Sequence, residues 1–295
     1  MGPAADTEAL PVPQPEPPSA SWLLVLFTFL VLPVAIGGVL FSPPVREGAL
    51  PVGGNVAFQL SLVLPALAWA HLSGLRRLPL LRLTWPPRMA LLLGAGTAFA
   101  TMLAGYGLVA LPQVLGWSSA PARQGAYAGL AEAGVGPWLF VVFIAILPGL
   151  CEELLFRGAL QTALLRGRSP ARAVAVGALA FAFFHLDPAG FPAHLLAGLA
   201  FGWLAWRTGS LWPGVVAHAL CNLATVPVMS SAGGAWVAAV GRSERNDLLY
   251  AWTTLAAGLA LFGLVVAAAR RWMPPSPETS SFLVRRLPGA SPRPS

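Results

Sequence analysis

The stretch WLFVVFIAILPGLCEELLFRGALQTALL, residues 138–165, decides the fold class of this chain. It is longer than the roughly 20 apolar residues that a helix needs to cross about 30 Å of hydrocarbon. Near its centre stand three charged side chains, Glu152, Glu153 and Arg157. Ionisable residues inside a membrane span are costly and mark functional sites by default. The stretch therefore predicts a membrane helix and, at the same place, a site of chemistry.

The rest of the chain has the composition of a membrane protein. Of its 295 residues, 56% are hydrophobic and only 10% are charged, whereas a soluble domain carries about 25% charged residues. All 18 basic residues are arginine, and they lie between apolar runs instead of in basic blocks. The net charge of +7 therefore indicates helices oriented by arginine, and no nucleic-acid partner is expected.

The apolar runs predict an all-α, polytopic membrane protein with about eight transmembrane helices. With this count, thirteen arginines fall on one side of the bilayer, four fall on the other, and Arg157 lies within a span. Because arginine-rich segments stay in the cytoplasm, both termini are expected there. The wealth of Ala, Gly and Pro is typical of a GC-rich genome, which favours a bacterial inner (plasma) membrane. The predicted spans are residues 21–41, 55–75, 89–111, 138–165, 171–185, 192–206, 211–229 and 249–269.

These spans divide the chain into a catalytic core and accessory segments. The core comprises spans four to seven, which hold Glu152, Glu153 and Arg157 together with the histidines His185 and His218. We predict a disordered cytoplasmic tail at 1–20, accessory helices one to three at 21–136, the core at 137–229, an outer loop with helix eight at 230–269, and a disordered basic cytoplasmic tail at 270–295.

The three central charges are not equivalent. Glu153 and Arg157 are four residues apart, in the order that favours pairing on one helix face. Glu152 is turned about 100° away from that face, so its partner must come from another span. A purely structural network of contacts, which fixes how the helices pack, would be enough to explain the pair of Glu153 and Arg157. It explains Glu152 poorly, because an unpaired acid in lipid is costly or stays protonated.

Two histidines and an asparagine are the candidate partners of Glu152. His185 ends the fifth predicted span, while His218 and Asn222 lie four residues apart on the seventh. The rise of a helix brings these side chains to depths that can meet near the midplane of the membrane. The predicted catalytic residues are therefore Glu152, His185, His218 and Asn222. The remaining histidines, which carry less weight, are His71 and His194.

This set of side chains is suited to hydrolysing a peptide bond. A carboxylate such as Glu152 takes a proton from water and returns it to the leaving amine, while His185 holds the water. His218 and Asn222 can donate hydrogen bonds to the oxyanion of the tetrahedral intermediate. Zinc is the alternative cofactor, because Glu152, His185 and His218 are also zinc ligands by type. Their spacing differs from the His-Glu-x-x-His zinc motif, so both mechanisms stay open at this point.

Three motifs in this order resemble those of the CPBP family, the CAAX protease and bacteriocin-processing intramembrane proteases. The family's Glu-Glu-x-x-x-Arg motif matches residues 152–157. Phe-x-x-x-His matches Phe181 and His185, and His-x-x-x-Asn matches His218 and Asn222. The stretch Arg-Thr-Gly-Ser-Leu-Trp-Pro at 207–213 is similar to the family's lead into the third motif. The resemblance covers about residues 137–229.

The resemblance implies a glutamic-type intramembrane endopeptidase without a metal cofactor. Its substrate would be a membrane-anchored or lipidated protein, and its first motif glutamate would activate water. Glu153, Arg157 and Phe181 would give structural support to the site. Two other classes remain as alternatives. One is a non-catalytic membrane scaffold or bacteriocin-immunity-type protein. The other is a proton-coupled transporter, which is less favoured because the chain has no convincing internal repeat.

Overall fold

A computed structural model of the protein describes residues 19–31, 33, 52–73, 77–114, 138, 141–229 and 244–273. All the regular elements in these ranges are helices, and the ranges contain no strand. This result confirms the all-α class. An apolar chain in lipid must satisfy its backbone hydrogen bonds within each segment, and a helix does so. Most of the predicted tails and of the long linkers at 112–137 and 230–248 lies outside the described residues.

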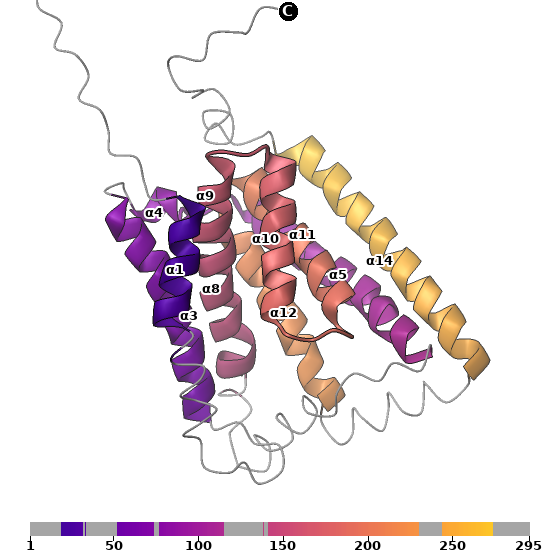
Figure 1. Cartoon of the computed structure of the whole chain (residues 1–295). Helices are drawn as coiled ribbons and strands as arrows, with labels where there is room; N and C mark the ends of the chain where they lie inside the picture. Colours follow the sequence, from indigo (N-terminus) through magenta and orange to yellow (C-terminus); the bar gives the residue numbers. More distant parts are fainter. Residues whose placement is uncertain are drawn as a thin grey trace, which may run out of the picture.

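Each of the eight predicted spans overlaps a helix of the structure (Figure 1). Within the described residues, two of these helices are long and apolar enough to cross a membrane by length and composition, over Arg88–Ala110 and Leu248–Trp272. The full count of eight spans stays a prediction. In chain order the elements are α1 (Ala20–Leu30), α3 (Val52–Leu72), α4 (Arg77–Leu80), α5 (Arg88–Val114), η1 (Val141–Ile146), α8 (Leu147–Glu153), η2 (Leu154–Leu160), α9 (Gln161–Leu165), α10 (Pro170–Phe184), α11 (Phe191–Thr208), α12 (Trp212–Met229) and α14 (Glu244–Trp272).

The helix that carries the three charges is interrupted twice by wider, π-helical turns. The first, η1, runs directly into α8, whose first turn contains Pro148. The second, η2, follows Glu153, and at its end the N–H of Gln161 bonds to the carbonyl of Phe156, five residues earlier. Such turns change the direction in which side chains point and often occur at functional sites. The sequence pattern predicted the helix but not these turns.

The site-bearing helices pack around α12. This helix contacts α5, α8, η1 and α11, so its side chains reach the interior from several sides. On the opposite side of the charged helix, α3 contacts α8 and η2. Figure 1 shows α1 and α3 on one flank of the molecule and the long α5–α14 pair on the other. The charged helix therefore lies in the middle of the bundle.

Arg82 and Arg207, two of the thirteen arginines that the predicted topology places in the cytoplasm, tie helix ends together. Arg82 is buried, and its side chain donates hydrogen bonds to Thr162 Oγ1 at 3.0 Å and to the Ala205 carbonyl at 2.6 Å. Arg207 donates to the Met273 carbonyl at 2.6 Å, just after the end of α14. The ends of α9, α11 and α14 thus meet arginines that the sequence placed on one side of the membrane. Their role in packing was not predicted.

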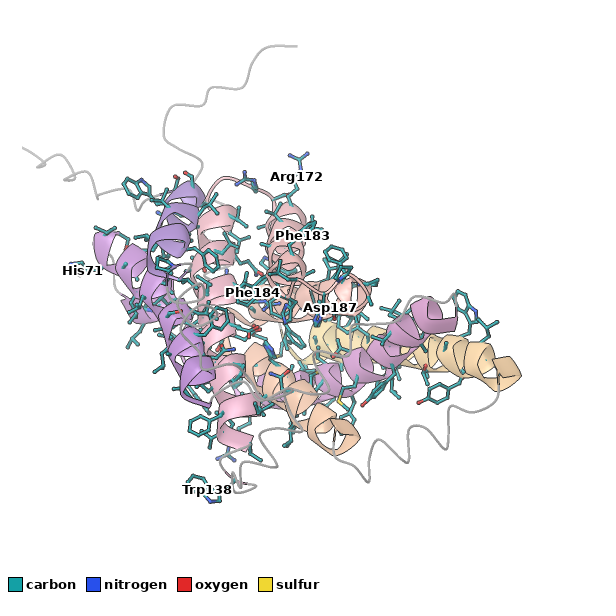
Figure 2. All side chains as sticks on the ribbon, turned by 60° about the horizontal axis from the view of Figure 1, so that its bottom comes forward. His71, Trp138, Arg172, Phe183, Phe184 and Asp187 are labelled. Carbon is teal, nitrogen blue, oxygen red and sulfur yellow. The ribbon has the colours of Figure 1, made fainter. Side chains whose placement is uncertain are left out.

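Arg172 and Trp138 mark the two ends of the helical bundle (Figure 2). Arg172, at the start of α10, and Trp138, at the start of the fourth predicted span, lie at opposite ends of the molecule (Figure 2). The positive-inside assignment puts these two residues on opposite sides of the membrane. The arrangement of the helices is therefore consistent with that assignment.

Candidate active site

Four ionisable side chains are buried together inside the bundle. Glu152 is 5% exposed, Glu153 0%, Arg157 1% and His218 4%. Charged groups almost never lie this deep unless they are paired, because removal from water costs several kcal/mol per ion. The partners of each group therefore decide what the site can do.

Glu153 and Arg157 form the predicted ion pair. Arg157 Nη1 donates to Glu153 Oε1 at 2.6 Å, and Nη2 donates to the Gly198 carbonyl of α11 at 3.3 Å. The guanidinium also lies over the ring of Phe181, 4.3 Å from its centroid. The prediction that this glutamate is neutralised on its own helix is confirmed. The pair also joins the charged helix to α10 and α11.

Glu153 has a second partner, the predicted catalytic residue His218, and this contact orients the imidazole ring. His218 Nδ1 lies 3.0 Å from Glu153 Oε1. A carboxylate only accepts, so this ring nitrogen is the donor, and Nε2 is turned to the other side of the ring. Close approach of α12 makes the contact feasible: a Cβ at Gly214 would lie 2.8 Å from Glu153 Oε2. Gly214 thus gives the carboxylate the space it occupies.

His185 is oriented by a backbone carbonyl. Its Nδ1 lies 2.8 Å from the carbonyl oxygen of Phe181, one turn earlier on α10. A carbonyl also only accepts, so Nδ1 is the donor and Nε2 is left for other contacts. The ring of Phe181 meets His185 edge-on at 4.6 Å and His218 at 5.6 Å, centroid to centroid. Phe181, predicted to give structural support, touches both histidines.

Both histidines direct Nε2 toward the same oxygen of Glu152. The distance from Glu152 Oε2 is 3.9 Å to His185 Nε2 and 3.8 Å to His218 Nε2. Both distances exceed a direct hydrogen bond, and a polar contact of this length suits a bridging water. The structure therefore brings together three residues that lie on three different helices and were predicted to share one site. Asn222 lies on α12, four residues after His218, and is half-buried.

Sequence reasoning missed one partner of Glu152. Gln59 on α3 is buried, and its Nε2 donates to Glu152 Oε1 at 3.3 Å. It lies 93 residues before Glu152, and no motif includes it. The available signal was weak: Gln59 is one of several polar residues in a predicted span that is mostly apolar.

His194 lies closer to the site than the sequence indicated, whereas His71 lies away from it. The ring of His194 stacks on that of His185, with centroids 3.9 Å apart and 19° between the planes. Its Nε2 lies 3.4 Å from Asp187 Oδ2, in the turn between α10 and α11 (Figure 2). His71 lies at the edge of the molecule, far from Asp187 and Phe184 (Figure 2). His194 is therefore a neighbour of the site, and His71 is not.

Glu152, His185 and His218 are suitable zinc ligands by residue type, but the distances between them suit zinc less well. Both histidines have Nδ1 held by a protein oxygen, as zinc-bound histidines do. Zinc bonds of about 2.0–2.2 Å, however, put tetrahedral ligands roughly 3.4 Å apart, closer than the 3.8 and 3.9 Å from Glu152 to the histidines. Among the residues that the structure describes, no group of three or more His, Cys, Asp or Glu is placed to hold a metal ion. The distances between these side chains therefore suit a bridging water better than a zinc ion.

Fold and site together define a class of protein: an apolar helical bundle with a buried acid facing two histidines. Residues 134–224 match a family model described as type II CAAX prenyl endopeptidase Rce1-like. The matched segment contains all three motifs and, over its length, confirms the family that they predicted. The curated proteins and the solved structures contain no match to the chain. The family is membrane-embedded and is one of proteases, which agrees with the apolar helices.

Proposed function

We propose that this chain is an intramembrane endopeptidase that cleaves a peptide bond of a membrane-anchored or lipidated protein. The observation that carries the proposal is the approach of two histidine Nε2 atoms to one oxygen of Glu152, at 3.8 and 3.9 Å. The three residues come from the segment that matches the Rce1-like family. The family supports CAAX-type proteolysis, and the geometry supports particular roles for each side chain.

Glu152 is the general base in this proposal. Its Oε2 is buried and has no hydrogen-bond partner among the described residues, so it keeps a lone pair for a proton. It takes one proton from a water held against His185, and the water oxygen bonds to the carbonyl carbon of the scissile peptide. When the C–N bond breaks, Glu152 gives the proton to the leaving nitrogen. Base and acid steps of this kind contribute about 10²–10⁴-fold to a rate.

His218 and Asn222 are the oxyanion donors in this proposal. The bond between His218 Nδ1 and Glu153 leaves Nε2 to carry the donating N–H. The imidazole then holds both ring protons, and the neighbouring carboxylate stabilises the positive charge, as the acid does in a serine protease triad. Asn222 would add its side-chain N–H one turn further along α12. Loss of one such donor typically costs about 10²–10³-fold in kcat.

The mechanism that we propose needs no metal. The wide spacing between Glu152 and the histidines supports water in place of zinc, and a chelator decides between the two.

We also propose a bacterial plasma membrane as the location, with both termini in the cytoplasm. The uneven arginine distribution supports this orientation. Reporter fusions at each end of the chain test it, and a periplasmic signal from either end would contradict it.

The central experiment uses the full-length protein in lipid nanodiscs. Membrane-anchored peptides, with and without a prenylated cysteine near the C-terminus, are incubated with wild type and with Glu152→Ala, each with and without a strong zinc chelator. Cleavage that is lost in Glu152→Ala and survives chelation would support the glutamate mechanism. Loss on chelation and recovery with zinc would replace it by a metalloprotease. Binding without cleavage across the panel would favour a scaffold.

A further inference from the structure

Glu152 receives a hydrogen bond from a helix outside the family-matched segment. That helix is α3, and the donor is Nε2 of Gln59, 3.3 Å from Glu152 Oε1. Gln59 is 6% exposed and Glu152 is 5% exposed, so water does not compete freely for this contact. The family match begins only at residue 134. The contact therefore adds to the site a residue that neither the match nor the motifs contain.

The orientation of the amide indicates which end of Gln59 matters. Its N–H end faces the carboxylate, while its carbonyl Oε1 is buried and has no hydrogen-bond partner among the residues described. A buried polar atom without a partner is unfavourable. A carboxylate oxygen only accepts, so the amide can bond to it through its N–H end alone. The contact with Glu152 thus determines how Gln59 is placed.

The surroundings hold Gln59 in place. Phe58, the preceding residue, stacks on Phe184 with centroids 5.9 Å apart and planes 7° apart. Phe184 in turn meets the ring of His185 edge-on at 5.8 Å. Leu62, one turn after Gln59, is fully buried in the apolar cluster that also contains Phe181. The part of α3 that carries Gln59 is therefore packed against the end of α10 that carries His185.

We infer that Gln59 is a positioning residue of the active site, which holds one oxygen of Glu152 so that the other faces the two histidines. Oε1 is held by the amide at 3.3 Å, and Oε2 lies 3.8 and 3.9 Å from the histidine nitrogens. With Oε1 fixed, rotation of the carboxylate away from the proposed water is restricted. This inference rests on the proposed function, and it makes α3 part of the catalytic unit.

The test separates positioning from a merely structural role. Gln59→Leu keeps the size of the side chain and removes the donor, and we expect kcat to fall about 10–100-fold, as for other small misplacements of a reacting group. KM should stay within about two-fold of wild type, because the lost interaction does not bind substrate. Gln59→Glu replaces the donor by a second carboxyl group beside Glu152 and should lower kcat further than Gln59→Leu. A rise in KM with unchanged kcat would overturn the inference, since it would make Gln59 a substrate contact.

Gln161 provides a matched control. It is also a buried glutamine, and it donates to the Gly202 carbonyl at 2.9 Å instead of to the site. Gln161→Leu should lower thermal stability and leave the kcat of the folded enzyme unchanged. An equal fall in kcat in Gln161→Leu and Gln59→Leu would mean general destabilisation and would overturn the inference.

A second measurement is independent of cleavage and decides the case if wild type cleaves no substrate in the panel. Thermal unfolding is compared for Gln59→Leu, Glu152→Leu and the double variant. Residues in direct contact have effects on stability that do not add. We therefore expect the double variant to lose less thermal stability than the two single variants lose together. Strict additivity would show that the two side chains are not coupled and would overturn the inference. Failure of the proposed function alone would leave the coupling intact.

Discussion

The central core and the α5–α14 pair are both apolar helix packings, but different contacts hold them together. In the core, polar side chains cross between helices: Arg157 reaches the Gly198 carbonyl, and His218 reaches Glu153. In the pair, the backbones approach each other at small residues. A Cβ at Gly258 would collide with the Ala104 backbone of α5. Hydrogen bonds fix distances and directions, whereas close packing of small residues mainly supplies contact area. Changes to the core side chains that contact Glu152, or that hold those contacts in place, should therefore alter chemistry, and changes in the pair should alter stability alone.

The largest effect is expected at Glu152. Glu152→Gln keeps the shape of the side chain and cannot take a proton from water, so the cleavage rate should fall about 10²–10⁴-fold. Thermal stability should be unchanged or higher, since the variant no longer buries a carboxylate. Initial rates and thermal unfolding in nanodiscs measure both quantities. A variant that retains more than about one tenth of the wild-type rate would contradict the role of general base.

The next effect concerns the ion pair. Arg157→Met leaves the Glu153 carboxylate buried without its guanidinium, which should lower the free energy of unfolding by about 3–5 kcal/mol. Denaturant unfolding in mixed micelles measures the loss. The informative control is the double variant Arg157→Met with Glu153→Leu, which removes both charges and should recover much of the stability. It should not recover activity, because His218 loses the carboxylate that orients it. Recovery of both would show that the pair only fills space.

A smaller effect is expected from one methyl group between α12 and the charged helix. In Gly214→Ala the new Cβ would lie 2.8 Å from Glu153 Oε2, so either α12 or the carboxylate must move. His218 follows one turn later on the same helix, and we expect kcat to fall about 10–100-fold. Gly263→Ala on α14 is the control, because a Cβ there meets nothing within 4 Å. It should leave kcat unchanged and add about 0.5–1 kcal/mol of stability through helix propensity. Equal kcat values for the two variants would contradict the close fit at Gly214.

Local patterns in the sequence were sufficient to predict much of the site. The four-residue spacing of Glu153 and Arg157 determines their pairing, because both lie on one face of one helix. The isolation of Glu152 on its own helix made a partner from elsewhere necessary. His185 and His218, at positions on other predicted spans that can reach the same depth, were the candidate partners, and the structure brings both to Glu152. These predictions rest on the spacing of side chains along one helix and on the free-energy cost of placing a charged side chain in lipid.

What the sequence did not predict depends on tertiary packing. Gln59 meets Glu152 across 93 residues, and only the packing of α3 against α8 and η2 makes them neighbours. His194 carried less weight than His185 and His218 in the sequence, yet the turn after α10 stacks it on His185. The π-helical turns around Glu152 also lack a local signature, because apart from Arg157 their residues are apolar like those of the neighbouring helical turns. Contacts of this kind become visible only once the helices are placed.

The last prediction concerns the α5–α14 pair, where a change should leave the chemistry intact. In Gly258→Ala the added methyl would meet the backbone of Ala104, and the two helices must separate slightly. Overpacking of this kind costs typically about 1–3 kcal/mol, so thermal unfolding should begin at a lower temperature. The kcat of the folded enzyme should stay at the wild-type value, because α14 carries none of the side chains that touch Glu152. A fall in kcat as large as that of Gly214→Ala would mean that α5 transmits the displacement to α12, which it contacts. The core would then depend on the pair for its geometry, and the division between the two regions would fail.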